Sequence, residues 1–64
     1  MIAVFTGGNR FLAEMDLPAV PRIGERVVLD GLWIVVDVTW ELKEGGSTAQ
    51  VSLKQTMPAA TLPR

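Results

Sequence analysis

Two pairs of polar side chains have a residue type and spacing that could support chemistry. Ser52 and Lys54 stand two residues apart in a strand-like segment, which would place a hydroxyl nucleophile beside an amine on one face. Glu14 and Asp16 have the same spacing, so a strand would hold their carboxylates about 7 Å apart, a separation compatible with acid–base catalysis or a weak cation site. Alternating polar residues on a solvated strand face give both patterns by default, and we favour that interpretation of each pair.

The composition excludes the commonest catalytic and metal-binding arrangements. The chain contains no cysteine and no histidine, so Ser-His and Cys-His nucleophiles, disulfides and the usual zinc sites are ruled out. The run Gly7-Gly8-Asn9-Arg10 is glycine-rich like a phosphate loop, but it lacks the Lys-Ser/Thr ending and the following helix that such a loop requires. The sequence therefore predicts no catalytic residue, no metal ligand and no cofactor, and a protein that is not an enzyme.

Length and charge narrow the classes of partner. A 64-residue chain forms one domain, which buries only about 60% of the surface that its unfolded chain exposes. Hydrophobic residues make up 48% of the chain, so we expect stabilisation by self-association into a homodimer or higher oligomer. The net charge is −1 and the six basic residues are scattered, which disfavours nucleic acid as a partner. Apolar runs are too short for a membrane span or a signal peptide, and a cytoplasmic protein is expected.

Three turn-forming dipeptides divide the sequence into strands. Gly8-Asn9, Asp30-Gly31 and Gly45-Gly46 each supply the positive φ angles that two-residue hairpin turns need. Two prolines indicate a loop over residues 18–24, because proline cannot donate a hydrogen bond to a central ladder. The pattern predicts no helix and five strands, over residues 2–6, 11–17, 26–29, 32–42 and 48–55.

The turns also predict which residues face one another, because a two-residue loop sets the register of a hairpin. The turn at Asp30-Gly31 would place Val28 opposite Trp33. The turn at Gly45-Gly46 would place Asp37 opposite Lys54 and pair apolar with apolar residues, namely Leu42 with Ala49, Trp40 with Val51, and Val38 with Leu53. In the first hairpin Gly7-Gly8 competes as the turn, and either choice puts on one face Ile2, Val4, Phe11, Ala13 and Met15.

The long segment over residues 32–42 decides the expected architecture. Its even positions are all apolar, and a strand with one continuous apolar face usually bends to serve both sides of a core. Five antiparallel strands bent in this way close into a small barrel, which also removes exposed edges. We therefore predict an all-β, five-stranded antiparallel barrel of SH3-like type over residues 1–56, with an OB-like barrel as the alternative and an irregular tail over residues 57–64.

The candidate binding surface is the outer face of the third and fourth predicted strands. If Ile34 and Trp40 point into the core, then Trp33 points outward and shares that face with the other members of the predicted patch, Arg26, Val28 and Val35. Trp and Arg are the residues most enriched at binding hot spots, so we interpret the patch as a partner-binding site. It could serve as an interface between copies or bind a foreign partner; alternatively, the tail or the proline-containing loop covers it within one chain.

The segment from Leu17 to Gly31, with the run Trp33–Val36 after it, resembles a pattern in short uncharacterised bacterial and phage β-barrel proteins. In that pattern a Pro-x-x-Gly-acidic turn leads into a strand, a tight turn and an aromatic-led strand; here P-x-x-G-E-x-V-x-L-D-G spans Pro21 to Gly31. The resemblance implies a small barrel encoded by a phage or its host, with no assigned activity. The run Gly24–Val27 is also similar to a KOW-type barrel motif of ribosome- and polymerase-associated proteins, whose later glycines and basic character this chain lacks.

These observations lead to three hypotheses for the function. The first is a non-enzymatic protein-interaction module that self-associates through the patch around Trp33. The second is a small nucleic-acid-binding barrel in which Trp33 stacks on bases beside Arg22, Arg26 and Lys54. The third, implied by the resemblance, is a phage-encoded binder of a host protein or a small metabolite.

Overall fold

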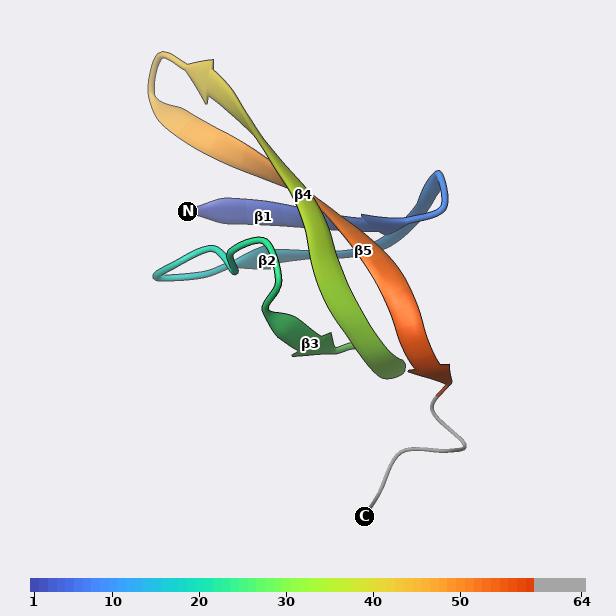
Figure 1. Cartoon of the computed structure of the whole chain (residues 1–64). Coiled ribbons are helices and arrows are strands. Elements are labelled where there is room, and N and C mark those ends of the chain that lie inside the picture. Colours follow the sequence, from blue (N-terminus) through green and yellow to red (C-terminus); the bar gives the residue numbers. More distant parts are fainter. Residues whose placement is uncertain (59–64) are drawn as a thin grey trace.

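The computed structural model describes residues 1–58, which form one curled sheet of five strands (Figure 1). The strands are β1 (Ile2–Gly7), β2 (Arg10–Asp16), β3 (Arg26–Val28), β4 (Gly31–Lys43) and β5 (Gly46–Pro58). Their order across the sheet is β2-β1-β5-β4-β3, and the sheet curls into a half-barrel. The predicted all-β fold of the small-barrel class is confirmed, and every predicted strand is present.

The sheet is mixed, so the prediction of a purely antiparallel barrel is wrong. β1 runs parallel to β5, in a register that places Ala3 beside Ala49 and Phe5 beside Val51. The other neighbouring strands are antiparallel. The β1–β2 hairpin therefore joins the sheet through the pairing of the first strand with the last. This long-range pairing cannot be read from local turn signals, which only report which consecutive strands meet.

The strand ends differ modestly from the predicted ones, most of all at the C-terminal side. β5 continues to Pro58, so Met57 and Pro58 belong to the sheet and not to the expected tail. Residues 59–64, the rest of that predicted tail, lie outside the described residues.

The first hairpin turns at Gly8-Asn9, as predicted. The φ angles of Gly8 and Asn9 are 56° and 64°, the two positive values that define a type I′ turn. A β-bulge then interrupts the ladder, because Thr6 pairs with Phe11 whereas Phe5 pairs with Ala13. The predicted face of this hairpin is therefore wrong for two residues: Ala13 and Met15 lie opposite Phe5 and Ala3, and not on the face of Ile2 and Val4. Ala3 and Phe5 are buried in the core, whereas Ile2 and Val4 are only half-buried.

In the β4–β5 hairpin, apolar residues lie opposite apolar residues as predicted, but each residue has a different partner from the one expected. Its turn is Glu44-Gly45, one residue earlier than expected, so that Trp40 lies opposite Ala49 and Val38 opposite Val51. A shift of two in the pairing leaves apolar residues opposite apolar ones. It does separate one predicted pair, because Asp37 lies opposite Ser52, and Lys54 lies opposite Ile34.

A second β-bulge, at Val36, exchanges the two faces of β4 halfway along the strand. Val35 lies opposite Leu53 and Asp37 opposite Ser52, so Val36 has no partner of its own on β5. Val38, Trp40 and Leu42 therefore share a face with Trp33 and Val35. The continuous even-numbered apolar face that was expected along this strand does not exist.

The core lies in the concavity of the half-barrel. Its large fully buried side chains are Phe5, Val35 and Val51, one from each of β1, β4 and β5. Trp33, Leu53 and two alanines complete the buried cluster, and half-buried residues surround it: Leu12, Ala13, Leu17, Val20, Val27, Leu29 and Val38. No buried polar side-chain atom among the described residues lacks a hydrogen-bond partner. The concave face is therefore the hydrophobic core of a single domain.

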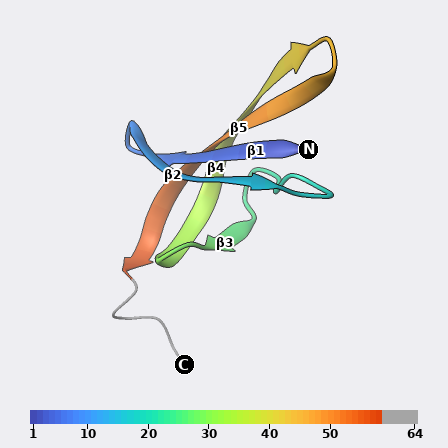
Figure 2. The same ribbon diagram turned by 180° about the vertical axis from the view of Figure 1, so that it is seen from behind.

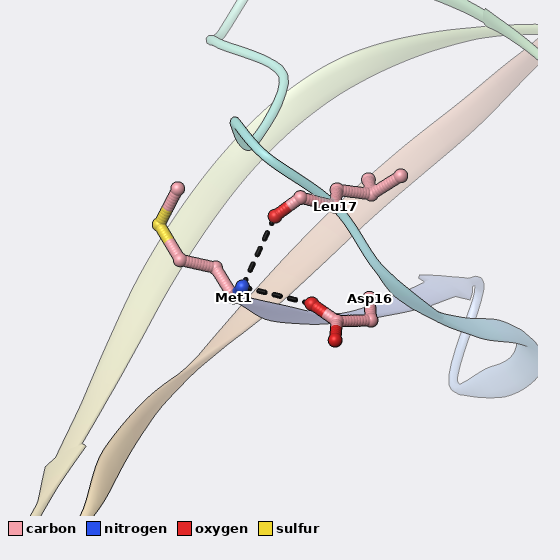
Figure 3. A network of polar contacts seen from close by, with 3 residues as sticks. All are labelled: Met1, Asp16 and Leu17. Carbon is pink, nitrogen blue, oxygen red and sulfur yellow. Dashed lines mark hydrogen bonds and ion pairs between the residues drawn. The ribbon is translucent and has the colours of Figure 1, made fainter.

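The first residue is tied to the end of β2 (Figure 3). The Met1 ammonium group donates to the Asp16 carboxylate at 2.9 Å and to the Leu17 carbonyl at 3.0 Å, while the Leu17 N–H donates to the Met1 carbonyl at 2.8 Å. These contacts extend the β1–β2 pairing by one residue. They also direct the chain from β2 into the loop that leads to β3.

Candidate functional site

The structure separates the four residues of the predicted patch. Trp33 and Val35 are buried, with 9% and 1% of their surface exposed, whereas Arg26 and Val28 are exposed on the opposite face of the sheet. The prediction that Trp33 and Val35 face the solvent is therefore wrong. The reason is the register after the turn between β3 and β4. Val28 pairs with Leu32 and Val27 with Trp33, one position away from the expected pairing. A slip of one residue moves every side chain to the other face.

Trp33 is held inside by two specific contacts. Its indole Nε1 donates a hydrogen bond to the Leu29 carbonyl at 2.5 Å, which satisfies the only polar atom of the ring. Its six-membered ring lies against the backbone of Gly7, where a Cβ would sit 2.9 Å from Cζ3 of Trp33 and 3.1 Å from Cδ1 of Leu12. Gly7 is therefore the residue that makes room for the indole. The site cannot use Trp33 as a contact surface.

The second tryptophan, which was expected in the core, is the exposed one. Trp40 is 45% exposed and its neighbour on the same face, Leu42, is 79% exposed. Both lie at the hairpin end of β4 and β5, which extends beyond the other strands (Figures 1 and 2). The face of the sheet that carries the core thus continues past it as an apolar surface that residues 1–58 leave exposed.

A groove of about 510 Å³ lies beside Trp40, between β4 and the loop that precedes β3. Its lining is Val20, Pro21, Arg22, Ile23, Val38 and Trp40. Ile23 is 65% exposed, so the apolar surface extends from β4 onto the loop. We call the combination of Pro21, Ile23, Val38, Trp40 and Leu42 the Trp40 surface.

Hydrogen bonds fix the loop beside β4. The Glu25 carboxylate accepts from the Arg22 N–H, and the Glu25 N–H donates to the Arg22 carbonyl at 3.0 Å. Gly24 has a φ of 92°, which glycine adopts without strain, and its N–H donates to the Val35 carbonyl at 2.8 Å. The Val35 N–H in turn donates to the Glu25 carbonyl at 2.9 Å. The wall of the groove is therefore a hydrogen-bonded turn over residues 22–25, which is attached to the middle of β4 at Val35.

Beyond Val35, β4 has one open edge. β3 pairs only with the first part of β4, up to Ile34, and the Gly24–Glu25 contacts end at Val35. From Asp37 to Lys43 the strand pairs with β5 on one side, and nothing within residues 1–58 donates to or accepts from its other side. This edge borders the Trp40 surface.

The residue pairs that could support chemistry are exposed or half-buried polar side chains. Asp16 accepts from the Met1 ammonium group, and Glu14 is exposed beside it on β2. Ser52 lies opposite Asp37, and the exposed Lys54 lies opposite Ile34. Within residues 1–58 no group of three His, Cys, Asp or Glu residues could hold a metal ion.

The basic residues of the nucleic-acid hypothesis are not gathered around an exposed ring at Trp33. In the sheet register Arg26 and Lys54 both lie opposite Ile34, one from each side. Arg22 lines the groove beside Trp40. The stacking role predicted for Trp33 is therefore wrong, since the ring lies in the core.

Comparison with family models, with curated proteins and with solved structures gives no match for this chain. The resemblance to bacterial and phage barrel proteins accordingly stays a prediction. In the part of the chain that the structure describes, no helix is long and apolar enough to cross a membrane.

Proposed function

We propose that this chain is a non-enzymatic protein-interaction module that self-associates through the Trp40 surface. The observation that carries the proposal is the exposure of Trp40 and Leu42 on the same face of the sheet as the buried core. A large aromatic residue beside an aliphatic one, on a surface continuous with the core, is the composition of a binding hot spot. An uncovered apolar patch of this kind marks an interaction site in a soluble domain.

The size of the chain favours a second copy as the partner. A 64-residue domain without disulfides has little core to stabilise it, and burial of an apolar face between copies adds to that core. The sequence-based proposal of self-association is kept, but its location moves from Trp33 to Trp40. The SH3-like assignment and a cytoplasmic location remain parts of this proposal.

Sedimentation equilibrium of the wild-type chain, from low micromolar to near-millimolar concentration, tests the proposal. We expect a reversible shift from monomer to dimer or higher oligomer. Trp40→Ser and Leu42→Ser should each weaken association by at least about thirtyfold, because they remove hot-spot side chains. Val28→Ser is the matched control, since Val28 is a comparably exposed apolar residue (68%) on the opposite face of the sheet.

The wild type and Val28→Ser should associate equally. A wild-type chain that stays monomeric and folded over the whole concentration range overturns the proposal. So does an association that Val28→Ser weakens and Trp40→Ser leaves unchanged, because it would place the contact on the outer face.

A further inference from the structure

We propose that two copies join edge to edge through β4, with the segments Asp37–Lys43 pairing as antiparallel strands centred on Trp40. One continuous sheet then runs across the dimer. This inference rests on the proposed function, since it assumes that the chain self-associates, and it adds the mode of pairing, the register and the backbone groups that bond. Three features of the hairpin carry it.

The first feature is a row of backbone N–H and C=O groups along the open edge of β4. Lys43 and Gly46 flank a two-residue turn, so in an antiparallel hairpin they exchange hydrogen bonds with each other, as does every second residue back along β4. The residues between them, Val38, Trp40 and Leu42, therefore direct their N–H and C=O groups to the open edge. Each has one donor and one acceptor. An edge of this length, unpaired by any of residues 1–58, is a template for another strand.

The second feature is that the segment is complementary to itself when it is reversed. With Trp40 at the centre, Trp40 lies opposite the partner's Trp40, and Val38 lies opposite the partner's Leu42. On the other face Asp37 lies opposite the partner's Lys43, which adds a pair of opposite charges at each end of the new ladder. Thr39 lies opposite the partner's Glu41. Apolar residues thus meet apolar residues, and Asp37 meets the opposite charge of the partner's Lys43. Glu41, which contacts Lys43 of its own chain at 2.9 Å, meets the uncharged Thr39.

Neighbouring registers lose this complementarity. Centring the ladder on Thr39 places Asp37 opposite the partner's Glu41, and centring it on Glu41 places two glutamates opposite each other; like charges directly opposite are destabilising. A slip of one residue puts the apolar face of one copy against the polar face of the other. The sequence of the segment therefore selects the Trp40-centred register.

The third feature is the groove next to the edge. Val38 is one of its lining residues, so the partner's Leu42, directly opposite Val38, arrives at the mouth of the groove. Leu42 is 79% exposed within one chain, and this position would cover it. The pairing thus buries the residues of the Trp40 surface together with the open edge.

Engineered cysteines test the register, because the chain has none of its own. In the proposed ladder Val38 and the partner's Leu42 have Cα atoms about 5.5 Å apart, within the range for a disulfide. Two copies of Val38 would be about 13 Å apart, four residues along the strand, which is out of range. A mixture of Val38→Cys and Leu42→Cys chains should therefore form the mixed disulfide dimer under mild oxidation, while neither variant cross-links alone. Lys54→Cys, on an exposed site of β5, is the control that should stay unlinked.

Leu42→Pro tests the backbone pairing independently. Proline removes the N–H that Leu42 directs to the open edge and leaves the ladder with β5 intact, which an edge strand tolerates. The substitution removes one hydrogen bond from each copy, so the dissociation constant should rise about tenfold to a hundredfold, while the circular dichroism spectrum of the monomer is unchanged. Leu42→Ala is the control for the lost side chain.

The outcomes separate this inference from the proposed function. If wild-type chains associate but Val38→Cys cross-links to itself, or the mixed disulfide is absent, the edge-to-edge register is wrong and self-association stands. If Leu42→Pro weakens association no more than Leu42→Ala does, the backbone pairing is likewise wrong. If wild-type chains do not associate in sedimentation equilibrium, the proposed function and this inference both fall.

Discussion

Substitution of Gly7 by alanine should destabilise the domain, because the indole of Trp33 occupies the space that a side chain at position 7 would need. The new Cβ would lie 2.9 Å from Cζ3 of Trp33 and 3.1 Å from Cδ1 of Leu12, distances that require these side chains to move. Overpacking of this kind costs about 1–3 kcal/mol. Replacing a glycine also lowers the conformational entropy of the unfolded chain, which offsets about 0.4–1 kcal/mol of this cost. From the middle of these ranges, the free energy of unfolding should fall by about 1–2 kcal/mol.

The measurement is urea denaturation followed by circular dichroism at one low protein concentration, so that self-association contributes equally to every variant. A loss of about 1–2 kcal/mol corresponds to a fall in melting temperature of roughly 4–16 °C for a domain of this size. The slope of unfolding free energy against urea should not change, because the surface exposed on unfolding is nearly the same.

A double-mutant cycle with Trp33→Phe shows whether the contact itself is responsible. Phenylalanine lacks the far edge of the indole, which carries Cζ3, so Gly7→Ala should cost much less in the Trp33→Phe background than in the wild type. The coupling free energy should be at least about 0.5 kcal/mol. Equal costs in both backgrounds, or a Gly7→Ala chain as stable as the wild type, would refute the packing of Trp33 against Gly7.

Three further expectations follow from the same structure. In Trp33→Phe and Trp40→Phe variants studied at concentrations where the chain is monomeric, acrylamide should quench the remaining Trp40 strongly and the remaining Trp33 weakly; equal quenching would contradict their different burial. Asn9→Ala should lower the free energy of unfolding by about 1 kcal/mol, because Asn9 has a φ of 64° that alanine adopts poorly, whereas Asn9→Gly should be nearly neutral in the same denaturation experiment. Titration with single- and double-stranded oligonucleotides at low salt should leave the tryptophan fluorescence unchanged, given the net charge of −1; a salt-sensitive change would favour the nucleic-acid-binding hypothesis.

The strand plan follows from the sequence because it depends on local chemistry. Glycine and asparagine tolerate positive φ angles better than other residues, and Gly8-Asn9 forms the first turn as predicted. Prolines at positions 18 and 21 keep the segment between β2 and β3 out of the ladder. The alternation along the β4–β5 hairpin survives a register error of two because pairing has a period of two.

The identity of the exposed tryptophan was decided by tertiary structure. Leu32, Trp33, Ile34, Val35 and Val36 are all apolar, so both faces of the first half of β4 read equally well as core. One signal in the sequence could have indicated the bulge: the apolar pairs Trp33–Val35 and Val38–Trp40 are out of phase, and only an extra residue lets both lie on one face.

The class of fold, the five strands and the absence of cysteine and histidine chemistry can be predicted from the sequence, since each rests on residue type and short-range spacing. The parallel pairing of β1 with β5, the inward position of Trp33 and the open edge beside Trp40 emerge only when the strands are packed together. The ladder is shifted by one residue at three places, which leave Leu12, Val36 and Thr56 unpaired, and each shift changes which face points inward without a strong local signature. Contacts between strands distant in sequence, such as Trp33 against Gly7, then fix the choice.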